Sequence, residues 1–136
     1  MNENPVSNNT VGENTVDPIT LTVIWNTLLS IAEELGTTLR NTAFSEGVRE
    51  GDDFSSALFD RSGRLIAQGS FSPGHLGSMP ACVQHAMDCF PVETLGPGDS
   101  ILMNDSFMCS GHFPDTFQVM PIFLDDVLVG FVACSA

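Results

Sequence analysis

A long helical pattern near the start of the chain constrains the fold more than any other feature. It begins at Asp17-Pro18, where the aspartate can cap free backbone amides and the proline fits the first helical turn. Apolar side chains then recur at helical spacing: Ile19, Leu21, Val23, Ile24, Trp25, Leu28, Ile31, Leu35 and Leu39. The pattern predicts a helix that ends near Arg40 or Phe44. Because it is apolar over much of its circumference, we expect either a core helix or one that packs against another subunit.

The rest of the chain predicts strands, one more helix and several turns. Strands are predicted at residues 54–60, 64–68, 100–104, 116–124 and 127–133. Turns at Arg61-Ser62-Gly63 and Asp125-Asp126 make the first two and the last two strands hairpins, and a helix is expected from about Met79 to Phe90. These elements indicate an α+β fold of mixed helices and antiparallel β-hairpins. Since the sequence stops directly after the last strand, we expect a partner subunit to complete the sheet.

The chain divides into a short arm and one domain. Residues 1–16 are rich in Asn, Glu and small residues without apolar periodicity, which predicts a flexible N-terminal arm. Residues 17–136 have the length of a single domain. Within it, residues 44–53 are expected to form a polar loop. Residues 72–80 are expected to form a Gly/Pro-rich connection that carries His75.

The charge balance excludes several kinds of partner. The chain has 17 acidic residues against four basic ones, a formal net charge of -13. Nucleic acid and anionic membrane surfaces need a basic face, so neither is an expected partner. No apolar run approaches the roughly 18 residues of a membrane span. The N-terminus also lacks the pattern of a secretory signal, so we expect a cytoplasmic protein with reduced cysteines.

Residues 104–115 concentrate the side chains that could carry chemistry. Cys109, His112 and Asp115 have spacings that let them converge on one metal ion, and zinc accepts thiolate, imidazole and carboxylate together. Cys134 lies at the end of the strand that returns toward this loop, so it is a candidate fourth ligand. The alternative is that both cysteines are small buried apolar residues and that His112 is hydrogen-bonded within its loop.

Other polar residues have weaker assignments. Asp52, Asp53 and Asp105 could orient a metal-bound imidazole, or they could cap turns. His75 is a candidate substrate or interface residue. Cys82 and Cys89 lie seven residues apart on the second predicted helix; we interpret them as neighbouring packed thiols. The sequence holds no phosphate-binding glycine loop and no serine hydrolase motif, so no ATP site is expected on this chain.

In their order along the chain, these motifs resemble the hydantoinase B / 5-oxoprolinase family. The resemblance rests on residues 17–21 with 24–26, 42–45, 53–60 (DFSSALFD), 63–68, 75–80 (HLGSMP), 98–99 with 104–105, and 112–115 (HFPD). It implies that His112 and Asp115 match metal-ligand positions of the family. Cys109, Ser110 and Gly111 stand where the family usually has Gly, Gly and Thr. The chain resembles only the N-terminal part of the much longer family subunit.

The resemblance also implies a function. The chain is similar to the small subunit of acetophenone carboxylases, which would make it a metal-binding subunit of an ATP-dependent ligase that carboxylates an aromatic ketone with bicarbonate. ATP, its Mg or Mn, and most substrate contacts would belong to larger hydantoinase A-like and B-like subunits, and the isolated chain would be inactive. The alternatives are a subunit of an ATP-dependent hydantoinase or 5-oxoprolinase, and a purely structural zinc subunit.

Overall fold

The computed structural model describes residues 16–111 and 113–136. The elements are, in order, α1 (Pro18–Thr42), α2 (Glu46–Gly51), β1 (Ser55–Asp60), β2 (Leu65–Gln68), α3 (Pro73–Cys89), the 3-10 turn η1 (Val92–Thr94), β3 (Ile101–Met103), β4 (Phe117–Leu124) and β5 (Val127–Ser135). The predicted arm 1–16 lies outside the described residues except for Val16. None of the described helices is long and apolar enough to cross a membrane.

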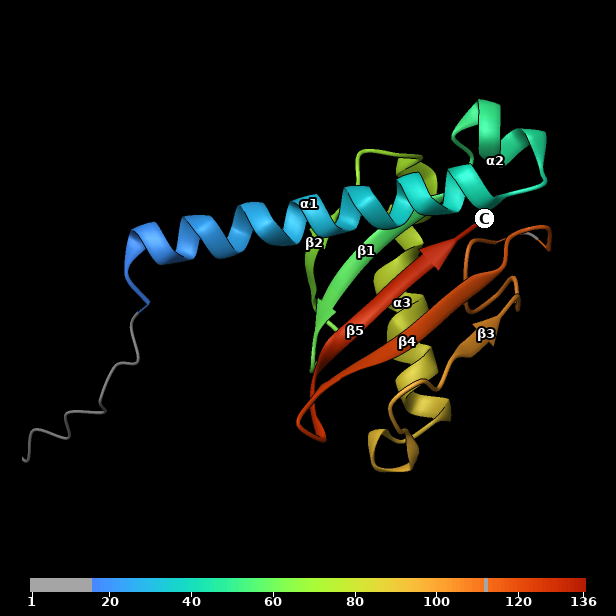
Figure 1. Ribbon diagram of the computed structural model, residues 1–136. Coiled ribbons are helices and arrows are strands. Elements are labelled where there is room, and N and C mark those ends of the chain that lie inside the picture. Colours follow the sequence, from blue (N-terminus) through green and yellow to red (C-terminus); the bar gives the residue numbers. More distant parts are fainter. Residues whose placement is uncertain (1–15, 112) are drawn as a thin grey trace, which may run out of the picture.

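One five-stranded antiparallel sheet, in the order β2-β1-β5-β4-β3, organises the domain (Figure 1). The two predicted hairpins, β1–β2 and β4–β5, are both present, and β1 pairs with β5 to join them. Asp125 and Asp126 both adopt positive φ, 48° and 63°, in the tight turn of the second hairpin. The α+β class predicted from the sequence is therefore confirmed. The sheet is open, and its completion by a partner stays a prediction.

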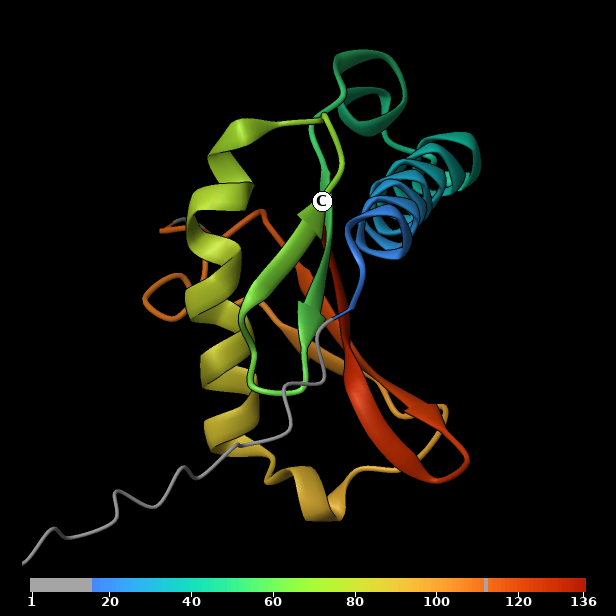
Figure 2. The ribbon, with the colours of Figure 1, turned by 90° about the vertical axis from the view of Figure 1, so that its left-hand side faces the viewer.

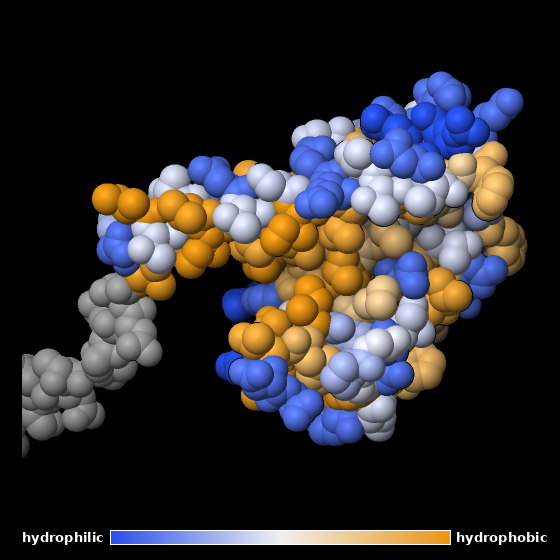
Figure 3. Space-filling model, viewed as in Figure 1, coloured by the Kyte–Doolittle hydropathy of each residue, from blue (hydrophilic) through white to orange (hydrophobic). Residues whose placement is uncertain are grey.

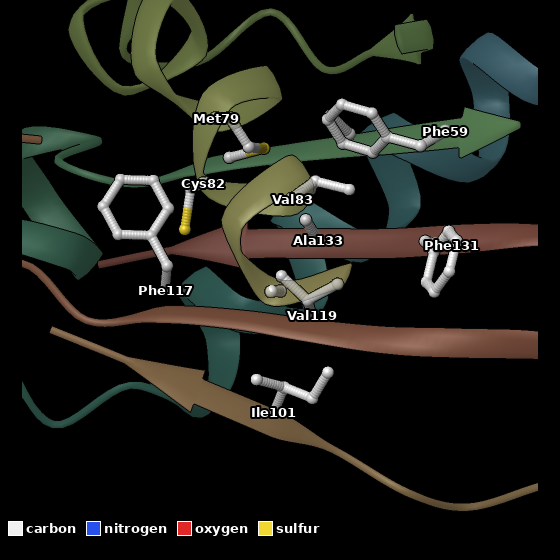
Figure 4. Packing of buried hydrophobic residues seen from close by; sticks show 11 residues of the cluster. Phe59, Met79, Cys82, Val83, Ile101, Phe117, Val119, Phe131 and Ala133 are labelled. Atoms are coloured by element: carbon white, nitrogen blue, oxygen red, sulfur yellow. The ribbon is translucent and has the colours of Figure 1, made fainter. Parts of the chain in front are cut away.

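The core lies between one face of the sheet and α3, while α1 crosses the other face (Figures 1 and 2). Residues that alternate along the strands point toward α3, as the two-residue period of a strand requires. Figure 4 shows side chains from α3 and four strands meeting in this layer. The cluster comprises Ala57, Phe59, Met79, Cys82, Val83, Ala86, Ile101, Phe117, Val119, Phe131 and Ala133.

Helix α1 packs most closely over its C-terminal half, while Trp25 and Leu29 line a hollow with β2. The Ser56 hydroxyl donates a hydrogen bond of 2.7 Å to the Ala32 carbonyl. Gly36 has no side chain, and the Phe71 ring occupies the space beside it. A Cβ atom added at position 36 would lie 1.9 Å from a carbon of that ring. The N-terminal half projects past the sheet and carries exposed apolar side chains (Figure 3), among them Ile19 (78% exposed) and Trp25 (51%). Within the described residues, only Ala32 and Gly36 of α1 are buried, so α1 is not a core helix of this chain, and its packing against another subunit stays a prediction.

The start of α1 is confirmed at the predicted cap. The Asp17 carboxylate accepts hydrogen bonds of 3.0 Å from the backbone amides of Ile19 and Thr20. We expect Asp17→Ala to speed hydrogen exchange of the first-turn amides about fivefold, because those amides lose their acceptors. Exchange followed by mass spectrometry checks this. Asp17→Asn keeps an acceptor and serves as the control, and equal exchange in all three proteins would contradict the capping role.

Two segments that were expected to be loops form helices instead. A short helix, α2, replaces the polar loop expected at residues 44–53. Helix α3 begins at Pro73 rather than near Met79, so the Gly/Pro-rich connection forms its first two turns. Proline suits the first helical turn because it lacks only an amide that would be free there anyway. The change matters for function because it places His75 in the first turn of a helix.

Candidate functional site

The ends of three strands meet the start of α3 at one edge of the fold. Ser135 at the end of β5 lies opposite both Ser55 of β1 and Phe117 of β4. Just beyond the strands, Thr116 and Ala136 exchange backbone hydrogen bonds of 2.8 and 3.2 Å. Segments that lie far apart in the sequence are thereby brought to the first turn of α3.

A buried histidine lies between two carboxylates at this edge. The His75 Nε2 atom is 3.2 Å from Asp115 Oδ2 and 3.8 Å from Asp53 Oδ1. The His75 and Asp115 residues are only 7% and 5% exposed, whereas the Asp53 side chain is 69% exposed. The His75 ring stands edge-on to the Phe117 ring, with centroids 6.3 Å apart. Among the described residues, His75 Nδ1 has no hydrogen-bond partner.

The segment before β1 is held so that Asp53 reaches this pair. Asp52 ends α2 in the left-handed conformation, and its carboxylate forms an ion pair with Arg40 at the end of α1. The Arg40 guanidinium also lies over the rings of Phe54 and Phe71, 5.7 and 5.6 Å from their centroids. These contacts connect α1, α2 and β1.

An open hollow adjoins Asp53. Its volume is about 650 Å³, and it is lined by Gly47, Gly51, Asp52, Asp53 and residues 70–73. The lining includes the residues that lead into α3, two positions before His75. A small polar molecule in this hollow would contact the exposed carboxylate of Asp53.

The structure does not bring the predicted metal ligands together as one set. Cys109 packs on the α3 side of the sheet, against Cys82. Cys134 lies on the opposite side, where it lines a small cavity with Leu35 of α1 and approaches Gln118. Asp115 lies with His75, and His112 lies outside the described residues. Within the described part of the chain, no group of three His, Cys, Asp or Glu side chains is arranged to hold a metal ion.

The structure decides between the alternatives for Asp105 and tests the predicted contact of Cys82 with Cys89. Asp105 caps a turn: its carboxylate accepts a 2.8 Å hydrogen bond from the Phe107 amide, and its carbonyl accepts from the Met108 and Cys109 amides. Cys82 and Cys89 are not a packed pair, because Cys82 is buried and Cys89 is exposed. Burial raises the pKa of the Cys82 thiol, and the hydrogen bond and charge of Cys109 raise it further.

The pKa values of the Cys109 and Cys134 thiols are also raised. Burial is the main cause that raises the pKa of Cys109; the Asp105 charge adds to it, while the Cys82 hydrogen bond opposes it. Burial alone raises the pKa of Cys134. Thiolate is the form that binds zinc, so these environments do not favour either cysteine as a ligand in the fold as described.

Chemically, the His75 cluster can position an imidazole and exchange protons. A carboxylate beside one ring nitrogen fixes the orientation of the ring. His75 could therefore act as an acid or base, or as a ligand supported by a carboxylate. The sequence does not predict the contact of His75 with Asp115, because 40 positions separate the two residues and the Gly/Pro-rich pattern around His75 is typical of a loop.

Comparisons with known proteins place these residues in a known fold. The profile of the family described as Hydantoinase B/oxoprolinase matches residues 17–136. The 5-oxoprolinase PfmaA of Pestalotiopsis fici is 34% identical over 131 residues, which are 96% of this chain and 10% of that protein.

Two solved structures are similar. The ATP-dependent caprolactamase of Pseudomonas jessenii superposes with a TM-score of 0.74 at 33% identity, over 90% of this chain and 21% of that one. An acetone carboxylase superposes with a TM-score of 0.78 over 88% of this chain and 16% of that one. At 21% identity, that second likeness shows the fold alone.

The chain thus spans between about a tenth and a fifth of the proteins it matches. The family profile nevertheless covers its whole described domain, from the cap of α1 to the last strand. This chain belongs to the hydantoinase B/oxoprolinase family.

Proposed function

We propose that this chain is one part of an ATP-dependent enzyme that acts on a carbonyl carbon, and that His75 is its proton-transfer residue. One observation carries the proposal: the buried His75 imidazole lies within 4 Å of both Asp115 and Asp53, and Asp53 also lines an open hollow. An imidazole oriented in this way can give a proton to a carbonyl compound or take one from it. Such proton transfer raises the rate of a reaction by a factor of about 10²–10⁴.

Each residue has its own part in this scheme. Asp115, buried beside Nε2, holds the ring and offsets the charge that His75 gains when it takes a proton. Nδ1 is buried and has no hydrogen-bond partner among the described residues, and His75 does not line the hollow, so a substrate in the hollow would meet Asp53 first. Asp53 forms the exposed wall of the site. The matched relatives are much longer than this chain, so we assign the remaining parts, including an ATP site, to sequence outside these 136 residues.

Two substrate classes fit this scheme. The first is an acetophenone-type aromatic ketone, carboxylated with bicarbonate by a complex with larger hydantoinase A-like and B-like subunits. The second is a cyclic amide, hydrolysed as the names 5-oxoprolinase and caprolactamase imply. The similarities favour the second class, because both of those proteins exceed 30% identity, whereas the acetone carboxylase supports the fold alone.

We keep a divalent metal such as zinc in the proposal, but with a different set of ligands. Cys134 is not among them, because it lies across the sheet from Cys109. The described residues do not complete a metal site, so a metal at Asp115 would also need His112 and a group from another chain. No reaction step is assigned to it, and a structural zinc remains the alternative. Metal analysis of the purified complex before and after Asp115→Asn tests this site.

Activity of the assembled enzyme tests the function. The complex would be purified with its partner chains and incubated with ATP and one substrate at a time: acetophenone with bicarbonate, hydantoin, 5-oxoproline or caprolactam. We expect ADP release to depend on a cyclic amide, and the isolated chain to be inactive. Release that depends on acetophenone and bicarbonate would instead identify a carboxylase. If none of these substrates stimulated ADP release, the proposed function would be wrong.

A further inference from the structure

Three sulfur atoms meet between α3 and the loop that precedes the candidate site. The Sγ atoms of Cys82 and Cys109 are 3.2 Å apart, and the Met103 Sδ atom lies 3.9 Å from Cys82 Sγ. Cys82 is completely buried on the inner face of α3, whereas Cys109 is partly exposed on the turn capped by Asp105. One thiol can therefore meet a dissolved reagent, and the other is enclosed behind it.

The loop that carries Cys109 touches α3 at two places. One is the thiol contact with Cys82. The other is the contact of Asp115 with His75, which lies seven residues before Cys82 and so about two turns away on the same helix. The two contacts lie about two turns apart on α3, and a covalent bond at the first would tie the loop to the helix.

We propose that Cys82 and Cys109 are a site of reversible oxidation at which a disulfide fastens the loop 104–111 to α3. A disulfide needs sulfurs about 2.05 Å apart, so the two atoms must approach each other by about 1.2 Å. A loop turn can make such a shift more easily than two packed core elements can. This inference does not depend on the proposed function.

The oxidant that we propose is a peroxide, which takes two electrons from the two thiols. The Cys109 thiol gives up its proton as its sulfur attacks one peroxide oxygen; a sulfenic acid forms on Cys109, the O–O bond breaks, and the leaving hydroxide takes that proton to become the first water. The Cys82 sulfur then displaces the hydroxyl of the sulfenic acid, the S–S bond forms, and the second water leaves with the Cys82 proton. Two thiols lose two hydrogens and two electrons, and one peroxide becomes two waters. A dithiol reductant reverses the change.

A disulfide suits this place better than a metal ion does. Three sulfur ligands could hold a soft cation, but both thiols would first have to ionise. Cys82 is enclosed in the apolar cluster, and the nearby Asp105 carboxylate opposes a second negative charge. A disulfide is neutral and keeps this region of the core uncharged.

Peptide mapping tests the proposal on the full-length protein, together with any chains that purify with it. The protein would be treated with hydrogen peroxide, blocked with an alkylating reagent and digested without reduction. We expect a cross-linked peptide that joins Cys82 to Cys109, with the mass of two hydrogens lost, and its disappearance after dithiothreitol. Oxidation should also raise the temperature of thermal unfolding, since a cross-link constrains the unfolded chain.

The variants give matched controls. Cys89→Ser and Cys134→Ser should keep the cross-link, whereas Cys109→Ser and Cys109→Ala should abolish it while their circular dichroism stays native. The proposal is overturned if Cys82 and Cys109 are recovered alkylated after peroxide has oxidised Cys89. It is equally overturned if the untreated protein holds a soft metal that Cys109→Ser loses.

Discussion

Replacing Gly130 with alanine should destabilise the domain by about 3 kcal/mol, near the upper end of what overpacking usually costs. Gly130 lies in β5, between Asp60 of β1 and Ile122 of β4. An added Cβ would stand 2.3 Å from the Phe59 carbonyl oxygen, which is backbone and cannot rotate aside. The pairing of β1 with β5 joins the two hairpins, so the clash acts at the centre of the sheet. Urea unfolding followed by circular dichroism measures the effect.

Gly77→Ala is the matched control for this experiment. Gly77 lies inside α3, and nothing stands within 4 Å of an added Cβ. Alanine there should be neutral or stabilise the protein by up to about 1 kcal/mol, because glycine is the weaker helix former. If Gly130→Ala unfolded at the same urea concentration as the parent, the close approach of β5 to Phe59 would be wrong.

Removing the His75–Asp115 pair should lower turnover far more than stability. We expect His75→Gln and Asp115→Asn each to reduce kcat/KM of the assembled enzyme by about 10²–10⁴, the range for a lost proton-transfer group. The double variant should be little worse than the more damaging single one, because residues that act as a unit are not additive. Steady-state kinetics on the accepted substrate measures all three, with assembly checked by sedimentation.

His85→Gln on the same helix is the control and should leave turnover unchanged, since His85 lies three turns from His75 and takes no part in the proposed site. A loss of stability without a loss of turnover would contradict the proposal. If both site variants assembled poorly and melted earlier, yet kept turnover per intact complex within tenfold of the parent, the pair would be structural. Some destabilisation is expected in either case, because each substitution leaves its buried partner with altered contacts.

Local signals were sufficient where one short segment determines its own structure. Asp17 and Pro18 predicted the start of α1, because capping involves only the first turn. The Asp125-Asp126 turn predicted the β4–β5 hairpin, because two residues with positive φ reverse the chain by themselves. The same local reasoning misplaced the start of α3: the glycines and prolines of residues 72–80 are typical of loops, yet packing of the helix on the sheet outweighs their weak helical preference.

The sequence by itself determined α1, the five strands, the α+β class, the acidic character and the family motifs. Only the tertiary structure decided which side chains meet. Cys134 does return beside the β4 strand as expected, but its register opposite Gln118 and Ser56 turns it toward α1. Cys109 packs on the other side, where α3 supplies Cys82. Successive residues of a strand face opposite sides of the sheet, so a shift of one position exchanges the partners of a side chain. The pairing of His75 with Asp115 likewise depends on where α3 lies against the ends of the strands, which spacing along the chain does not reveal.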